Sequence, residues 1–157
     1  MTYVAARRQT SDQGRVDHAH RLREERRSTY LAFLEAIEPV DNAVHSVDSE
    51  YVNNLLATGS PDWSAMEAVA EQVYDASRSL YRLSSRIQLA GPKGMADSAD
   101  EIWVAVRELH TELVKIWDSK EIPSVDALEA GLWTCIAVFE RRKREFTEGV
   151  RDVLETP

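Results

Sequence analysis

Cysteine, glycine and proline are scarce in this chain. Its 157 residues include one cysteine, six glycines and five prolines. The single cysteine, Cys135, allows no intrachain disulfide and excludes a zinc site built from several cysteines. So few glycines and prolines leave little material for the many tight turns of a β-sheet protein. These scarcities favour a helical protein without a disulfide framework.

Long hydrophobic runs are also missing. No apolar run approaches the roughly 18–20 residues that a transmembrane helix requires. Residues 1–8 lack the apolar centre of a signal peptide. The segment Gly91–Gly94 has neither the length nor the preceding strand of a phosphate-binding P-loop. We therefore expect a soluble, cytoplasmic protein that binds no nucleotide through such a loop.

Four long segments carry hydrophobic side chains at alternating steps of three and four residues, which is the spacing of one helix face. The pattern begins near Val16 and shows none of the strict alternation of a β-strand. The predicted core positions are Tyr30, Phe33, Ile37, Val40, Val44, Val47 and Tyr51, then Met66, Ala70, Val73, Ser77, Leu80, Ser84 and Ile87, then Ala99, Ile102, Val106, Leu109, Leu113 and Ile116, and finally Leu128, Leu132, Cys135, Phe139, Arg142, Phe146 and Val150.

Three short breaks separate these segments, at Thr58–Asp62, Gly91–Gly94 and Ile122–Ser124. The first and third combine a helix-ending glycine or proline with a polar residue that can cap the next helix, and the second supplies glycine and proline ahead of a capping residue a few positions later. Short connections force neighbouring helices to be antiparallel. The sequence therefore predicts an all-α fold, an antiparallel up-down-up-down four-helix bundle formed as a single domain by residues 16–157.

Two local features qualify that picture. Residues 1–15 are polar with little apolar periodicity, so we expect a flexible, mobile N-terminal tail. Pro39 lies inside the first helical segment, where a proline removes a backbone hydrogen bond and clashes with the preceding turn. We expect either a kink near Pro39 or two helices in series.

Asp97 or Ser98 is the expected cap of the third helix, and Ser124 that of the fourth.

The formal net charge of −8 is unevenly distributed. Residues 1–30 hold seven arginines against four acidic residues, whereas residues 31–139 hold eighteen acidic against seven basic residues. In an up-down bundle, the start of the first helix and the ends of the second and fourth lie at one pole. We call this predicted cluster the basic pole, and its candidate partner-binding residues are Arg23, Arg26, Arg27, Arg82, Arg86, Lys93, Arg141 and Arg144.

The basic pole has two interpretations. It could dock an anionic surface such as nucleic acid, a phosphorylated ligand or an acidic partner. It could equally complement the helix dipoles and form ordinary ion pairs with nearby glutamates. The overall acidity and the absence of a recognition motif argue against nucleic acid.

Catalytic and metal-binding patterns are weak. The Glu-x-x-His pattern of di-metal bundles is absent, and the pairs His20–Glu24 and Asp41–His45 lack further ligands. We therefore predict no metal, no cofactor and no catalytic residue. Cys135 is expected to be a small buried side chain.

The four tryptophans, Trp63, Trp103, Trp117 and Trp133, are expected to line the core or a groove. If two of them are exposed together, a surface for binding another protein becomes the better interpretation.

Arg15 and His20 have the Arg-x4-His spacing, which resembles the motif of the helical HEPN ribonucleases. In that family the arginine would stabilise the scissile phosphate and the histidine would move protons. The motif lies near the N-terminus here, whereas the family carries it late in the bundle.

Residues 26–34 resemble an Arg-x-x-Tyr-x-x-Phe-Leu segment, and residues 86–92 resemble an Arg-hydrophobic-x-Leu-x-Gly-Pro segment. Both are similar to segments of uncharacterised small helical proteins of actinobacteria. The resemblance extends loosely over residues 22–110. It implies a helical bundle and no particular activity.

The favoured hypothesis is a non-enzymatic interaction module. It would bind a protein partner, or self-associate as a homo-oligomer through coiled-coil-like contacts, using aromatic and charged surfaces. One alternative is a nucleic-acid-binding regulator that uses the basic pole. Another is a small HEPN-like ribonuclease that uses Arg15 and His20.

Overall fold

Every regular element in the described part of the chain is a helix. The computed structural model describes residues 3–47, 57–59 and 61–155, with side chains described from Asp17 onward except Ala19. The helices are α1 (Tyr3–Ser46), α3 (Trp63–Ala90), α4 (Lys93–Ser119), α5 (Val125–Leu128), η2 (Glu129–Trp133) and α6 (Thr134–Glu155). No helix in these ranges is long and apolar enough to span a membrane.

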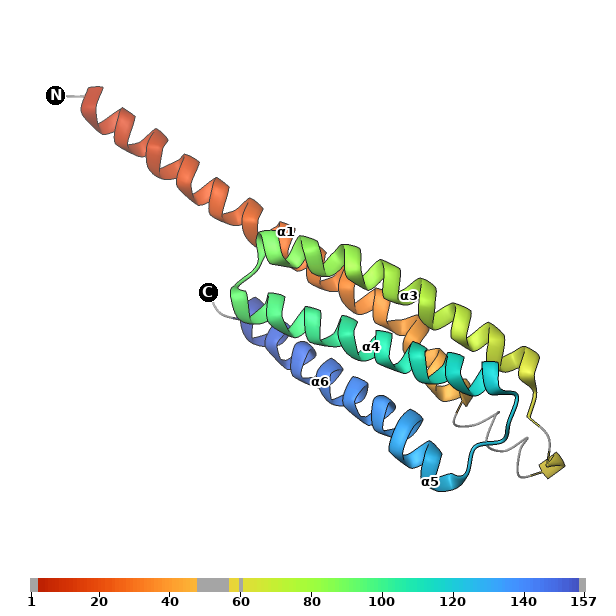
Figure 1. Cartoon of the computed structure of the whole chain (residues 1–157). Helices are drawn as coiled ribbons and strands as arrows, with labels where there is room; N and C mark the ends of the chain where they lie inside the picture. The colour runs from red at the N-terminus through yellow and green to blue at the C-terminus, as the bar shows by residue number, and fades with distance from the viewer. Residues whose placement is uncertain (1–2, 48–56, 60, 156–157) are drawn as a thin grey trace.

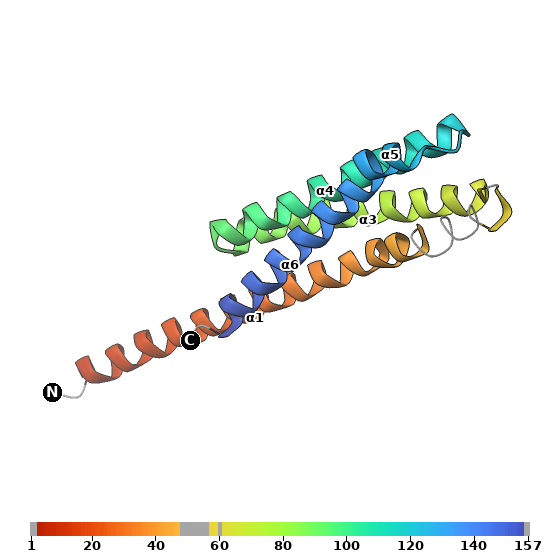
Figure 2. The same ribbon diagram turned by 90° about the horizontal axis from the view of Figure 1, so that it is seen from below.

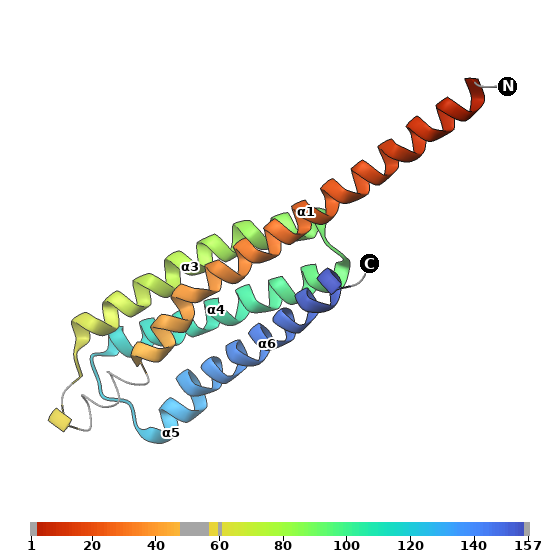
Figure 3. The same ribbon diagram turned by 180° about the vertical axis from the view of Figure 1, so that it is seen from behind.

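The helices form an antiparallel up-down-up-down bundle (Figures 1 and 3). Helix α1 packs beside α3, α3 beside α4, and α4 beside α6, whereas the contact between α1 and α6 is much smaller. The predicted fold class is therefore confirmed. The bundle is also asymmetric, because the backbones of α1 and α6 are in contact over a much shorter stretch, although Phe146 of α6 packs against Tyr30 and Phe33 of α1 with ring centroids 6.3 and 4.8 Å apart.

The core consists largely of the predicted stripes. In α3, all seven predicted positions from Met66 to Ile87 are buried. In α4, the positions from Ala99 to Leu113 are buried, and Ile116 is half-buried. In α1, Ala43 is buried where Val44 was expected, and Val44 packs against the core at its edge. Tyr51 lies outside the described residues.

The last helical segment differs from its prediction at two positions. Cys135 is half-buried. Arg142 is also half-buried, and its Nη1 pairs with Glu101 Oε2 of α4 at 3.1 Å and with Glu145 Oε2 at 2.9 Å. Arg142 therefore lies at the margin of the core, where its guanidinium reaches carboxylates on two helices.

Helix α1 begins at Tyr3, well before the predicted start near Val16. The backbone of residues 3–15, predicted as a tail, continues the same helix and projects beyond the rest of the bundle (Figure 2). At 44 residues, α1 is about 66 Å long, against about 42 Å for the 28 residues of α3. The mobility of this segment stays a prediction.

Pro39 is accommodated within α1, which continues to Ser46 as one helix and is not divided into two helices in series. Because proline has no backbone N–H, it cannot donate to the carbonyl of Glu35. The carbonyl of Pro39 itself accepts a hydrogen bond from Gln72 Nε2 of α3 at 2.9 Å. A contact from the neighbouring helix therefore holds the backbone at this position.

Two predicted helix starts are confirmed in detail and one is wrong. Asp62 Oδ1 accepts from the backbone N–H groups of Ser64 and Ala65, at 3.1 and 3.0 Å, and Ser124 Oγ accepts from Ala127 N at 3.2 Å. Helix α4 was expected to start at Asp97 or Ser98, but it starts at Lys93 with Pro92 as its N-cap. The φ of −60° at Pro92 leads directly into the first turn.

The turn between α3 and α4 lies where the bundle topology predicted it, beside α1 and the end of α6. Arg26 Nε of α1 donates to the carbonyl of Ala90 at 2.6 Å. A Cβ placed on Gly91 would lie 2.9 Å from the hydroxyl of Tyr30 and 2.9 Å from the carbonyl oxygen of Ile87. On α6, a Cβ on Gly149 would lie 2.9 Å from Met95 Sδ.

A π-helical turn, η2, interrupts the last helical segment. A Cβ on its Gly131 would lie 2.8 Å from Glu112 Oε2 of α4. The hydroxyl of Thr134 donates to the carbonyl of Glu129, five residues earlier, at 2.7 Å. Nothing in the hydrophobic pattern indicates this turn, which depends on contact with α4.

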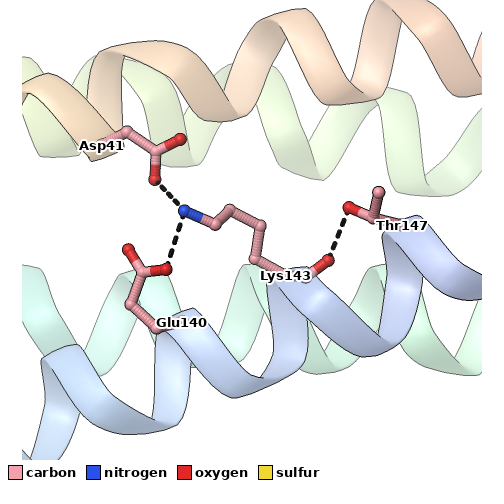
Figure 4. A network of polar contacts seen from close by, with 4 residues as sticks. All are labelled: Asp41, Glu140, Lys143 and Thr147. Atoms are coloured by element: carbon pink, nitrogen blue, oxygen red, sulfur yellow. Dashed lines mark hydrogen bonds and ion pairs between the residues drawn. The ribbon is translucent and has the colours of Figure 1, made fainter.

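Lys143 connects α6 to α1 across their small contact (Figure 4). Its Nζ lies 2.7 Å from Asp41 Oδ1 and 2.8 Å from Glu140 Oε2. Burial alone would lower the pKa of Lys143, but the hydrogen bonds and charges of Asp41 and Glu140 outweigh it and raise the pKa above 10.5. The ammonium is therefore held charged between the two helices.

We expect Gly91→Ala to destabilise the fold by about 1–3 kcal/mol, because the added methyl meets backbone as well as the Tyr30 hydroxyl. Gly94→Ala is the matched control, since no atom lies within 4 Å of its added Cβ, and a gain of about 0.5–1 kcal/mol is expected inside α4. Urea unfolding measures both.

The buried hydroxyl of Tyr30 has no hydrogen-bond partner, so Tyr30→Phe should leave stability unchanged or raise it, and should relieve part of the Gly91→Ala cost. Equal stability losses for the two glycine variants would contradict the close approach at Gly91.

A double-mutant cycle on Asp41→Asn and Lys143→Met should give a coupling energy of about 0.5–1 kcal/mol, since both side chains are partly exposed. The cycle on Lys93 and Asp97 is the control, because that pair is within one helix and far more exposed. A coupling energy near zero for Asp41 and Lys143 would show that the α1–α6 ion pair does not stabilise the bundle.

Candidate interaction surface

Aromatic and arginine side chains gather on the outer side of α3 and α4, away from the core. The aromatic residues recur at intervals of seven, at Tyr74 and Tyr81 on α3 and at Trp103 and His110 on α4. Seven residues are close to two helical turns, so each pair lies on one face of its helix. We call this region the aromatic–arginine surface, and it consists of Tyr74, Arg78, Tyr81, Arg82, Trp103, Arg107 and His110.

The antiparallel packing of α3 on α4 brings the two rows together ring to ring. The centroids of Tyr81 and Trp103 are 5.1 Å apart with the planes tilted by 45°. The centroids of Tyr74 and His110 are 5.3 Å apart with a tilt of 39°. Both distances are within the range of favourable aromatic pairs. Each ring is therefore held by its partner across the helix–helix interface.

Two arginines lie over these rings. The guanidinium carbon of Arg107 is 5.0 Å from the centroid of Trp103, and that of Arg78 is 6.0 Å from the centroid of Tyr74. These distances are those of cation–π contacts. These contacts hold the two charges beside the rings, and a guanidinium in such a contact can still donate hydrogen bonds to another molecule.

The surface remains open to solvent. Tyr74 and Tyr81 are 49% and 54% exposed. A cavity of about 540 Å³ lies between the helices, lined by Ser77, Arg78, Tyr81, Arg82, Trp103 and Arg107. Tyr81 and Trp103 thus form part of the wall of an open cavity, and Tyr74 is exposed nearby on the same helix as Tyr81.

His110 is partly buried against Tyr74, and this burial lowers the pKa of the imidazole below its ordinary value of 6.5. The ring is therefore neutral at pH 7. In the pair with Tyr74 it behaves as an uncharged aromatic group.

A second aromatic cluster lies at the end of the bundle where α3 begins and α4 ends. Lys120 Nζ lies 3.9 Å from the ring centroid of Trp117 and 5.4 Å from that of Trp63. Both tryptophans are half-buried, as is Trp133 on η2. The expectation that tryptophans line the core or a groove agrees with these positions, and Trp103 is the one that borders the aromatic–arginine surface.

The residues assigned to the basic pole do not share one surface. Arg23, Arg26 and Arg27 of α1 line a cavity of about 830 Å³ beside Pro92 and the end of α6. Arg26 is engaged with the carbonyl of Ala90. Lys93 pairs with Asp97 at 2.6 Å. This cavity also contains Glu24, Asp152 and Glu155, so its charge is mixed.

The other four predicted residues do not line this cavity. Arg82 belongs to the aromatic–arginine surface, and Arg86 lies one turn further along α3, close to the end of that helix at Ala90. Arg144 and Arg141 precede the end of α6 by roughly 16 and 21 Å along the helix. Arg144 lines a separate cavity with Asp41 and Lys143. The sequence identified the correct end of each helix but overestimated how many arginines reach the pole.

Among the described residues, no group of three His, Cys, Asp or Glu side chains could hold a metal ion. Burial, followed by the nearby charges of Glu112 and Glu108, raises the pKa of the Cys135 thiol. His20 lines the cavity at the pole, and the side chain of Arg15 lies outside the described residues.

His110 should make stability depend on pH. Its folded-state pKa is lowered, so the unfolded chain takes up the proton first as the pH falls below about 6.5. The contribution of His110 to the free energy of unfolding is complete above that pH and is lost progressively as the pH falls below it. His110→Gln should flatten the stability profile between pH 5 and 6.5 in urea unfolding.

His18→Gln, at an exposed position of α1, is the control for loss of an imidazole. An NMR titration midpoint for His110 above 6.5 would contradict the assignment.

Comparisons with known proteins leave the chain without a relative: no protein-family model, no curated protein and no solved structure matches it. The resemblance to helical actinobacterial proteins stays a prediction, and function must be argued from this surface alone.

Proposed function

We propose that this chain is a non-enzymatic interaction module that binds a protein partner through the aromatic–arginine surface. The observation that carries the proposal is the pairing of half-exposed rings across α3 and α4, with arginines stacked over them. Tyrosine, tryptophan and arginine are the residue types that dominate binding energy at protein interfaces.

The position of the surface supports the same function. Its side chains stand on two packed helices and not on loops, so little conformational freedom is lost when a partner binds. Ser77, which lines the cavity, is only 8% exposed, and Leu80 of α3 and Val106 of α4 are fully buried in the core. A partner would therefore contact a surface whose shape is fixed by the core.

Charge indicates what kind of protein the partner is. Arg78, Arg82 and Arg107 make the surface positive although the whole chain is acidic. A second copy placed symmetrically on this surface would bring arginines against arginines, which disfavours a two-fold dimer formed here. An acidic segment of another protein is the complementary occupant.

The test uses the double variant Tyr74→Ser/Tyr81→Ser, which removes two half-exposed rings without opening the core. Leu89→Ser is the matched control, because Leu89 is 90% exposed on the same helix and lies outside the surface. Proteins captured by immobilised wild-type chain would be identified, and the affinity of the purified partner measured. We expect the double variant to weaken binding at least tenfold and the control to leave it unchanged.

Circular dichroism and urea unfolding establish that both variants fold. Equal affinity of the partner for all three chains would refute the proposal. Salt-dependent binding of DNA or RNA, reduced by Arg23→Gln and Arg27→Gln but not by the tyrosine changes, would instead favour a nucleic-acid-binding regulator.

A further inference from the structure

We infer that the cavity within the aromatic–arginine surface binds a phosphate monoester, carried on a side chain of the partner protein. This inference rests on the proposed function and specifies what the partner presents. The cavity is the one of about 540 Å³ between α3 and α4. Its lining combines three arginines with a serine hydroxyl and two aromatic rings, and it includes no carboxylate.

Uncompensated positive charge is the first line of support. Within the described ranges, no ion pair joins Arg78, Arg82 or Arg107 to an acidic side chain. Ion-paired cations in those ranges include Lys93, Lys115, Arg142 and Lys143. What distinguishes Arg78, Arg82 and Arg107 from the other arginines is that they line one cavity without a carboxylate. Three unpaired guanidinium groups around one cavity leave about three positive charges for a ligand to neutralise.

The second line of support is that these arginines already have contacts that place them around the cavity. The guanidinium carbon of Arg107 lies over Trp103 at 5.0 Å and that of Arg78 over Tyr74 at 6.0 Å. Arg82 Nη2 lies 3.5 Å from Ser79 Oγ, one turn earlier on α3. A guanidinium held by its face offers its N–H edge as a fork, which matches the oxygens of an anion in a bidentate manner.

Phosphate fits this set better than a single carboxylate does. A phosphate monoester carries about −1.5 to −2 charges at pH 7 and three acceptor oxygens, so it can engage several guanidinium groups at once. A carboxylate carries one charge and two oxygens, which leaves most of the local positive charge unmatched. Tyr81 and Trp103 supply an apolar wall for the carbon part of the phosphorylated side chain, and a phosphorylated tyrosine would use that wall most fully.

The experiment titrates phenyl phosphate into the whole chain and follows the indole N–H signals of its four tryptophans by NMR. We expect the Trp103 signal to shift in a saturable manner, while that of Trp133 on η2 does not move. Benzoate, which replaces the phosphate by a carboxylate, should bind at least tenfold more weakly. Arg107→Gln and Arg82→Gln should each weaken phenyl phosphate binding at least tenfold, and Arg151→Gln, on α6, should not.

Three results would overturn the inference: no shift at Trp103, equal affinities for phenyl phosphate and benzoate, or equal shifts in the Arg107→Gln variant. These results would leave the proposed function standing. If the inference is wrong and the proposed function is right, the partner captured through Tyr74 and Tyr81 would still bind after enzymatic dephosphorylation. Conversely, loss of that partner's binding on dephosphorylation, restored by rephosphorylation, would support both.

Discussion

The antiparallel packing of α3 on α4 is the constraint on which the rest of this structure depends. The two helices leave the Gly91 turn side by side, and that turn has no room for a side chain because Tyr30 and the α3 backbone approach it closely. The two-residue connection from Ala90 to Lys93 fixes the register between α3 and α4. The same register buries one stripe of each helix and brings Tyr81 opposite Trp103 and Tyr74 opposite His110 on the other side.

Much of the fold follows from periodicity, because burial of a helix face is a local property of the sequence. The stripes of α3 and α4 could be predicted almost residue by residue, and so could the caps at Asp62 and Ser124. The candidate surface could not. Tyr74 and Tyr81 form a second, weaker row with a seven-residue interval, and only the register between two helices shows that this row faces Trp103 and His110.

Two of the features that the sequence pattern does not indicate coincide with contacts distant in sequence. The π turn at Gly131 lies against Glu112 of α4, and the passage of α1 through Pro39 is accompanied by a hydrogen bond from Gln72 of α3. The prediction of the basic pole groups charges near helix ends without counting the rise of about 1.5 Å per residue along the helix axis. On α6, that rise places Arg141 and Arg144 several turns before the end of the helix, away from Arg23 and Arg27.

The small contact between α1 and α6 has a consequence for how the chain folds. Gln88 and Asp100, which join α3 to α4, are 12 residues apart, whereas Lys143 and Asp41, which join α6 to α1, are 102 apart. Most of the packing is thus between consecutive helices, a topology of low contact order that favours rapid folding. The α1–α6 seam requires the largest loop closure, and Phe146 of α6 reaches its place against Tyr30 and Phe33 of α1 only when that loop closes. We therefore expect this seam to form after the contacts between consecutive helices.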